Sequence, residues 1–189
     1  MIANVERVSN LFVSKTTYAA LIAIAVILLA IPYPFLPRHL TIVSTITIGL
    51  PAFFLALAPN AQIYRPGFVQ RVLKFAIPAG TVATITVLIT YLLARSQGMN
   101  LTQERTLATL SLVVVGLWIL TLLARPFTRG RYLLLLVLVA LLLIGAVVPF
   151  MSSFFAIEFA SPAAVLETFL ISALGCSVLE VWGRVRSKD

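Results

Sequence analysis

Long apolar stretches alternate with short polar ones along the sequence, and they set the architecture. Each apolar stretch has close to the roughly 20 residues that an α-helix needs to cross the hydrocarbon of a bilayer. None alternates polar and apolar residues with a period of two, which argues against a membrane β-barrel. The pattern predicts an all-α integral membrane protein, a bundle of about six transmembrane helices at about 11–31, 40–58, 72–93, 106–124, 132–150 and 162–181. We expect a single membrane domain over 1–189, with a cytoplasmic stalk at 1–10 and a cytoplasmic tail at 182–189.

Hydroxyl groups, a glycine and a proline interrupt the second apolar stretch. Ser44 and Thr47 bring hydroxyls near the middle of the membrane, and Gly49 and Pro51 follow them. Because proline has no N–H, the carbonyl of Thr47, four residues earlier, loses its helical partner. An unpaired carbonyl in hydrocarbon is costly and must face protein, water or an ion. The pattern predicts a helix broken at Gly49-Leu50-Pro51 that contributes to a cation site. A plain proline kink, with the hydroxyls bonded back along their own helix, is the alternative.

Polar residues also open the first apolar stretch, which begins Ser14-Lys15-Thr16-Thr17-Tyr18 near the predicted cytoplasmic boundary. Lys15 has two interpretations. Its side chain snorkels to the interface, or it points inward and acts as a built-in cation near the site. Taken together, the two stretches predict an ion path along Ser14, Lys15, Thr17, Ser44, Thr47, Gly49 and Pro51.

Two acidic residues lie in the last apolar stretch. Glu167 is in its outer half, where an ionisable residue is a functional candidate by default. It is equally a candidate partner for an arginine of an outer loop. Glu180 and Arg184 are four residues apart at the inner end of this stretch, and their spacing predicts an interfacial ion pair rather than a transport site.

Composition and charge agree with a membrane location. The chain is 61% hydrophobic and 11% charged, whereas a soluble domain averages about 45–50% apolar and about 25% charged residues. The net charge of +8 comes from cations in short loops between apolar stretches, so we expect no nucleic-acid partner. If the N-terminus is inside, eleven cations are cytoplasmic and three are external, which predicts that both termini are cytoplasmic. The inner group is Arg7, Lys15, Arg65, Arg71, Lys74, Arg125, Arg129, Arg131, Arg184, Arg186 and Lys188, and the outer group is Arg38, Arg95 and Arg105.

The chain has few residues of the types that form disulfides, bind metal ions or catalyse reactions. Cys176 is the only cysteine, so no intrachain disulfide forms, and its apolar surroundings predict a packed thiol. His39 is the only histidine, so the clusters of Cys and His that mark zinc sites are absent. The sequence therefore offers no catalytic residue, and it leaves the metal ligands of any ion site unknown.

Two segments resemble the C-terminal membrane block of P-type ATPases. The first, Ala3-Asn-Val-Glu-Arg-Val-Ser-Asn-Leu-Phe12, resembles the amphipathic stalk that leads into the family's fifth membrane helix. The second, Ile48-Gly-Leu-Pro-Ala52 followed by Ala56-Leu-Ala-Pro-Asn60, resembles the sixth helix of calcium-pump-like members. The run from Phe35 to Asn60 is similar to a bacterial branch of cation pumps, and the other four predicted helices agree with the family's seventh to tenth in number and spacing.

The resemblance implies the membrane transport domain of an ATP-driven cation pump in the cell membrane. Its implied partners are the lipid bilayer, the remaining domains of the pump and a transported cation, calcium among the candidates. The sequence departs from the calcium-pump pattern, because Ile48 and Tyr18 stand where acidic ligands are usual and Lys15 stands where an amide is usual. Calcium prefers several oxygens including carboxylates, so the usual calcium site is not carried over.

The sequence also lacks the phosphorylation motif Asp-Lys-Thr-Gly and the cytoplasmic domains of the family. In such a pump, ATP and Mg²⁺ would bind to these other domains, and we expect no cofactor in this chain itself. We read the chain as a piece of a longer pump. An independent six-helix transporter or scaffold without ATPase activity is the alternative.

Overall fold

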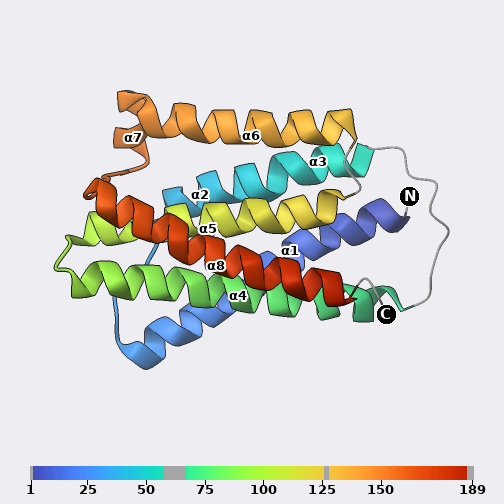
Figure 1. Cartoon of the computed structure of the whole chain (residues 1–189), viewed down its shortest axis with the longest axis horizontal. Coiled ribbons are helices and arrows are strands. Elements are labelled where there is room, and N and C mark those ends of the chain that lie inside the picture. The colour runs from blue at the N-terminus through green and yellow to red at the C-terminus, as the bar shows by residue number, and fades with distance from the viewer. Residues whose placement is uncertain (1, 58–66, 126–127, 187–189) are drawn as a thin grey trace.

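The computed structural model describes residues 2–57, 67–125 and 128–186, and within these ranges every regular element is a helix (Figure 1). The helices are α1 (Ile2–Leu29), α2 (Pro37–Ser44), η1 (Thr45–Gly49), α3 (Leu50–Leu57), α4 (Phe68–Ser96), α5 (Leu101–Ala124), α6 (Arg129–Val147), α7 (Pro149–Phe154) and α8 (Pro162–Arg186). α2, η1 and α3 make one span of 21 residues, so the described residues contain six helices long and apolar enough to cross a membrane. The predicted all-α membrane bundle is confirmed.

The helix ends differ from the predicted ones in informative ways. The predicted stalk is continuous with the first span, because α1 starts at Ile2 and has no proline or glycine up to Leu29. α7 is an additional short helix, which Pro149 starts from the first helical position after α6. The irregularity expected at Gly49-Leu50-Pro51 is a π-helical turn over Thr45–Gly49, which ends at the first of these three residues, and the backbone stays helical throughout. Residues 58–60 of the second motif, together with Arg65 and Lys188, lie outside the described residues.

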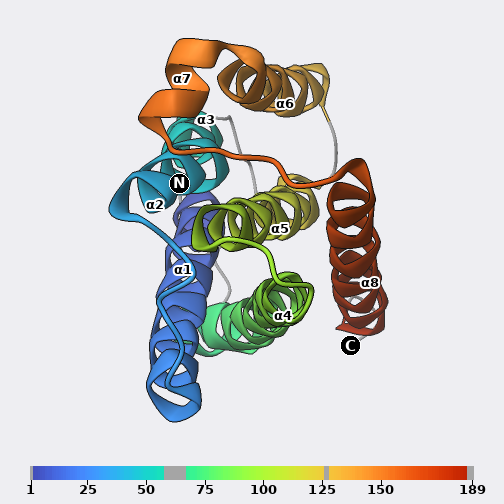
Figure 2. The same ribbon diagram turned by 90° about the vertical axis from the view of Figure 1, so that its left-hand side faces the viewer.

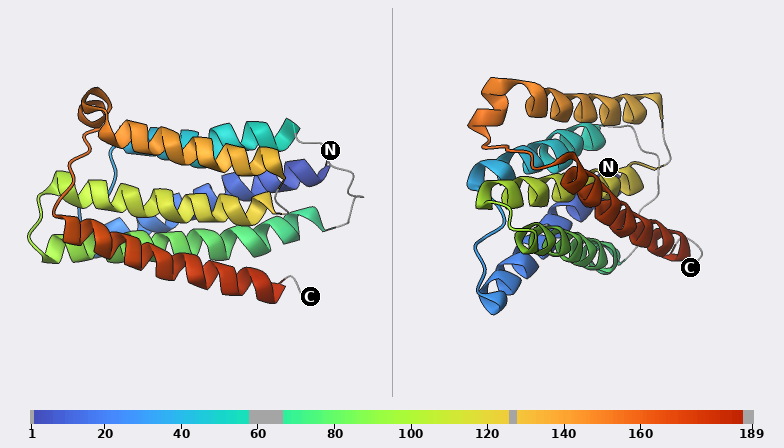
Figure 3. Two further views of the ribbon diagram at one scale, coloured as in Figure 1. Left: turned by 45° about the horizontal axis from the view of Figure 1, so that its top comes forward. Right: turned by 60° about the vertical axis from the view of Figure 1, so that its left-hand side comes forward.

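The bundle is built around α4 and α5. An end-on view shows α5 near the centre, with α1 and the α2–α3 helix on one side and α8 on the other (Figure 2). α6 and α7 lie at the periphery above α2 and α3, as the further views also show (Figure 3). The side chains of α6 are largely exposed, Leu133 and Leu143 among them, as expected for a helix that faces lipid. The two described ends of the chain lie at the same end of the bundle (Figure 1).

Threonines packed against glycines bring the central helices close together. A Cβ placed on Gly80 of α4 would lie 2.5 Å from Cβ of Thr17 in α1. A Cβ placed on Gly116 of α5 would lie 3.0 Å from Cγ2 of Thr47. A third contact of this kind joins Gly175 of α8 to Thr86 of α4. Small residues that let backbones approach are typical of helix interfaces in membranes.

Hydrogen bonds to backbone carbonyls fix the loop between α1 and α2, at the end of the bundle opposite the termini. The hydroxyl of Tyr91 in α4 donates to the carbonyl of Pro32 at 3.0 Å, and Nε of Arg105 in α5 donates to that of Tyr33 at 3.1 Å. Burial raises the pKa of the Tyr33 phenol, so the loop carries no charge from this group. His39 lies 2.7 Å from the carbonyl of Phe155 through Nε2, which ties the start of α2 to the end of α7.

Candidate functional site

The π-helical turn lies inside the second membrane span. The N–H of Leu50 donates to the carbonyl of Thr45, five residues back, instead of to that of Ile46. Pro51 has no N–H to offer to either Ile46 or Thr47. The register shift and the proline together remove the helical donors that these two consecutive carbonyls have in a regular α-helix. Single π turns of this kind are frequent at functional sites.

Thr47 fixes this turn against α5. Its side chain is 4% exposed, and its hydroxyl donates to the carbonyl of Val43 at 2.8 Å. Its methyl group packs against Gly116. Of the other residues predicted for this stretch, Pro51 is buried, Ser44 is half-buried and Gly49 is exposed. The hydroxyl therefore bonds back along its own helix, as in the alternative of a plain kink, while the turn itself is more than a kink.

A row of buried polar side chains follows α1 at a spacing of four residues. Asn10, Ser14 and Tyr18 are 6%, 3% and 6% exposed. Among the described residues, Oδ1 of Asn10, Oγ of Ser14 and the Tyr18 hydroxyl have no hydrogen-bond partner. Three such atoms in one row are unusual, because buried polar groups are nearly always paired. The sequence interpretation included Ser14 only; the four-residue spacing of polar positions was the signal that could also have found Asn10 and Tyr18.

The structure turns two predicted residues of α1 in different directions. Thr17 packs against Gly80 of α4, and its hydroxyl donates to the carbonyl of Val13 at 2.8 Å, so it faces away from the second span. Lys15 is half-buried. It is eleven residues, or three helical turns, beyond Asn4, whose Nδ2 donates to the carbonyl of Ala56 in α3 at 3.1 Å.

The spacing between Asn4 and Lys15 indicates where Lys15 lies along the axis of the bundle. α1 and the α2–α3 helix run antiparallel (Figure 1), and eleven residues correspond to about 16 Å along either helix. Helical geometry thus puts Lys15 on the face of α1 that Asn4 occupies, level with the π turn. The structure brings α1 and the π turn into contact. The seven residues of the predicted path remain a prediction, with Thr17 and Thr47 directed to α4 and α5.

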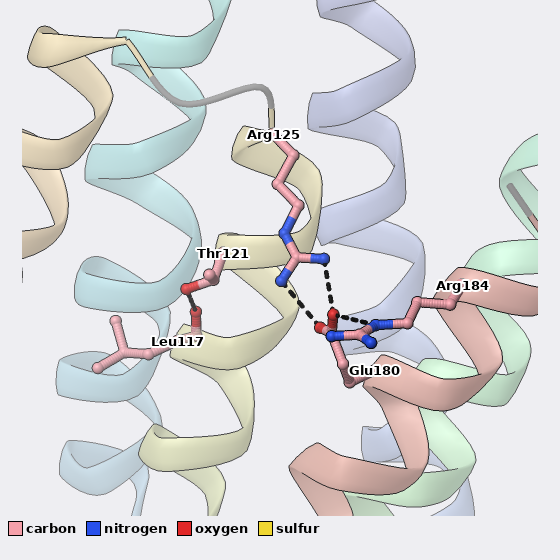
Figure 4. Close-up of polar contacts among 5 residues, drawn as sticks. All are labelled: Leu117, Thr121, Arg125, Glu180 and Arg184. Carbon is pink, nitrogen blue, oxygen red and sulfur yellow. Dashed lines mark hydrogen bonds and ion pairs between the residues drawn. The ribbon is translucent and has the colours of Figure 1, made fainter.

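The acids of α8 have separate surroundings. Glu180 accepts two bonds from Arg125 of α5, at 3.0 and 2.8 Å, and one from Arg184 at 3.0 Å (Figure 4). The pair predicted between Glu180 and Arg184 is therefore present, and Arg125 joins it across the helix interface. Glu167 accepts a bond from Nε2 of Gln97 in α4 at 2.8 Å, a neutral partner that the sequence did not suggest.

The atoms near the π turn that could bind a cation are neutral oxygens. Neither α1 from Asn10 onward nor the second span contains an aspartate or glutamate. Among the described residues there is no group of three His, Cys, Asp or Glu side chains able to hold a metal ion. The arrangement can therefore offer carbonyl, hydroxyl and amide oxygens to a cation, together with the positive charge of Lys15.

The sequence is similar to several bacterial membrane proteins, although no protein-family model matches it. Over its whole length it is 35% identical, across 202 aligned positions, to the calcium-transporting ATPase CtpE of Mycobacterium bovis. The chain is homologous to part of a cation-transporting ATPase. The CtpE protein of Mycolicibacterium smegmatis is 40% identical over 71% of the chain. A probable cation-transporting ATPase of Streptococcus pneumoniae, exp7, is 25% identical over the same share.

The chain spans about a quarter of the length of the CtpE relative from M. bovis. The relatives are P-type cation-transporting ATPases, as the stalk and the Gly-Leu-Pro segment implied. The six apolar helices agree with a membrane portion of such a pump, and the chain is a multi-pass membrane protein.

Proposed function

We propose that this chain is the membrane portion of an ATP-driven cation pump and that the ion path runs between α1 and the π turn of the second span. The observation that carries the proposal is the π turn over Thr45–Gly49, directly before Pro51. It deprives two membrane-embedded carbonyls of helical donors, and such carbonyls are tolerated only where they face protein, water or an ion. The buried unpaired atoms of Ser14 and Tyr18 on α1 also support a polar site on this helix.

Calcium is the cation that the names of the mycobacterial relatives favour. It prefers a set of oxygens that includes carboxylates, and neither α1 from Asn10 onward nor the second span supplies one. In this proposal any carboxylate ligand comes from another part of the pump. In this proposal Lys15 is a built-in cation, which repels a second ion and sets the number of ions bound.

Other domains of the pump supply the energy for transport. The charges of the loops indicate how this chain is oriented in the membrane. ATP and Mg²⁺ bind to domains outside this chain, which contains no cluster for phosphoryl transfer. The termini and the loop at Gly67 lie in the cytoplasm of the cell, because the cations concentrate at that end of the bundle. The ion therefore crosses the cell membrane past the π turn.

The test is cation-dependent ATP hydrolysis by a complete pump that carries this chain. Thr47→Val keeps the shape but removes an oxygen, and we expect an apparent cation affinity about 2- to 10-fold lower, the worth of one hydrogen bond. Pro51→Ala supplies an N–H to the carbonyl of Thr47, so the helix gains stability while cation-dependent turnover falls. Thr41→Val is the matched control, since Thr41 is exposed on the same helix. Wild-type cation dependence in both Thr47→Val and Pro51→Ala would show that the path is elsewhere.

A further inference from the structure

A small cavity lies between α4, α5 and α8, in the half of the bundle away from the termini. Its polar lining consists of Thr90, Gln97, Glu167 and Thr168, and Leu93, Ala94, Leu107, Ala164 and Ile171 complete the wall. The space is about 170 Å³, part of which is open to solvent, and its enclosed part is about the size of one water molecule or an ion of that size.

The lining offers oxygen acceptors. The hydroxyl of Thr90 donates to the carbonyl of Thr86 at 3.0 Å, and that of Thr168 donates to the carbonyl of Ala164 at 2.9 Å. Each hydroxyl proton is thus used on a backbone carbonyl, and the oxygen lone pairs stay available. Both side chains are almost completely buried, with 2% and 1% exposed.

Glu167, which is half-buried, and Gln97, which is exposed, complete the set of acceptors. Nε2 of Gln97 donates to Oε2 of Glu167 at 2.8 Å, a bond that uses neither Oε1 of Glu167 nor Oε1 of Gln97. No lysine or arginine is among the residues that line the cavity, so the carboxylate has a neutral partner within it. A bound cation would supply this carboxylate with the positive partner that the lining lacks.

We infer that this cavity binds one monovalent cation of the size of Na⁺, through the carboxylate of Glu167 and the neutral oxygens of Gln97, Thr90 and Thr168. One carboxylate balances one positive charge, whereas a divalent ion takes more oxygens and more charge than this lining has. The site is separate from the proposed ion path. Thr90 lies ten residues, or about 15 Å, along α4 from Gly80, where α1 packs.

Hydroxyls below the cavity hold the three helices in place. Thr90 lies 3.4 Å from Oγ of Ser111 in α5, which accepts a bond from Ser172 of α8 at 3.2 Å. Ser111 and Ser172 are completely buried. A cation in the cavity would join α4 and α8, two of the three helices that this network joins, and cation binding is expected to stabilise the bundle.

The test uses the full chain purified in detergent and its thermal unfolding, detected by a thiol-reactive dye at Cys176, which is buried in the folded state. Melting is compared in NaCl and in choline chloride at equal ionic strength. We expect Na⁺ to raise the unfolding midpoint of the wild type. In Glu167→Gln the half-effective Na⁺ concentration should rise about 10- to 100-fold, the worth of a charged contact. Thr168→Val removes one oxygen and keeps the shape, and we expect a smaller shift in the same direction.

Glu158→Gln is the matched control, because Glu158 lies at the same end of the bundle and binds Asn100 and Gln103 instead of lining the cavity. It should keep the wild-type response to Na⁺. Equal midpoints in NaCl and choline chloride would overturn the proposal. A wild-type Na⁺ response in both Thr168→Val and Glu167→Gln would also overturn it. So would an unfolding midpoint that depends on pH and not on Na⁺, which would show that a proton and not Na⁺ neutralises Glu167. None of these readouts depends on pump activity, so failure here is distinct from failure of the proposed ion path.

Discussion

The closest approach between α1 and α4 can be tested by adding a single methyl group. In Gly80→Ala the new Cβ would lie 2.5 Å from Cβ and 2.7 Å from Cγ2 of Thr17, and 3.0 Å from the carbonyl oxygen of Ser14. Cβ of Thr17 and the carbonyl oxygen of Ser14 are fixed by the backbone, so rotation of the Thr17 side chain cannot relieve these two contacts. The two helices must move apart, and the packing along their interface is lost with them.

The magnitude follows from two opposing effects. Overpacking a well-filled interface costs about 1–3 kcal/mol, and replacing glycine by alanine in a helix returns up to about 1 kcal/mol. We expect a net loss of about 1–2 kcal/mol in the free energy of unfolding, or a midpoint about 2–8 °C lower for a chain of this size. The dye assay at Cys176 measures this midpoint in detergent.

A matched substitution separates the two effects. Gly130 in α6 has no atom within 4 Å of a Cβ added to it, so Gly130→Ala should leave the midpoint unchanged or raise it slightly. Thr17→Gly in the Gly80→Ala background makes room for the methyl group and should recover part of the loss. The reasoning is refuted if Gly80→Ala melts at or above the wild-type midpoint, as Gly130→Ala is expected to do.

Two further predictions concern the ends of the bundle. Reporter fusions at Gly67 and Gly130 should give a cytoplasmic signal and those at Gln97 and Ser153 an external one, because of the distribution of Lys and Arg; a cytoplasmic signal at Gln97 contradicts this topology. Tyr91→Phe removes the bond to the carbonyl of Pro32 and should lower the free energy of unfolding by about 1 kcal/mol in the same melting assay, since the carbonyl is left without this donor; an unchanged midpoint would show that the bond does not fix the loop.

The sequence predicts the membrane helices well because the apolar length needed to cross a bilayer is a property of each helix alone. The irregularity near Pro51 is likewise predictable, since the missing N–H is a covalent fact. The π form of the turn is not, and neither is the packing of Thr47 against Gly116, which needs the placement of another helix. For the same reason the sequence could not tell that Thr17 faces α4.

The buried row on α1 shows where the sequence signal was overlooked. Asn10 belongs to the predicted stalk, which in the structure is continuous with the first span, and its side chain is buried. Tyr18 stands out in the sequence only as a departure from the calcium-pump pattern. Polar residues four apart on a helix share a face, so Asn10, Ser14 and Tyr18 could have been grouped. Partners such as Gln97 for Glu167 needed the packing of distant helices.

The two walls of the proposed path differ in stiffness. α1 has 28 residues without glycine or proline, so it is about 42 Å long, some 12 Å more than the hydrocarbon is thick. Arg71 of α4 forms an ion pair with Glu6 near the start of α1 at 2.8 Å. Because α1 is a continuous helix, a displacement of this end is expected to move Ser14 with it. The opposite wall has a π turn and a proline, which concentrate bending at one place. A force on α1 is therefore expected to change the shape of the second span at the π turn, where two carbonyls lack their α-helical donors.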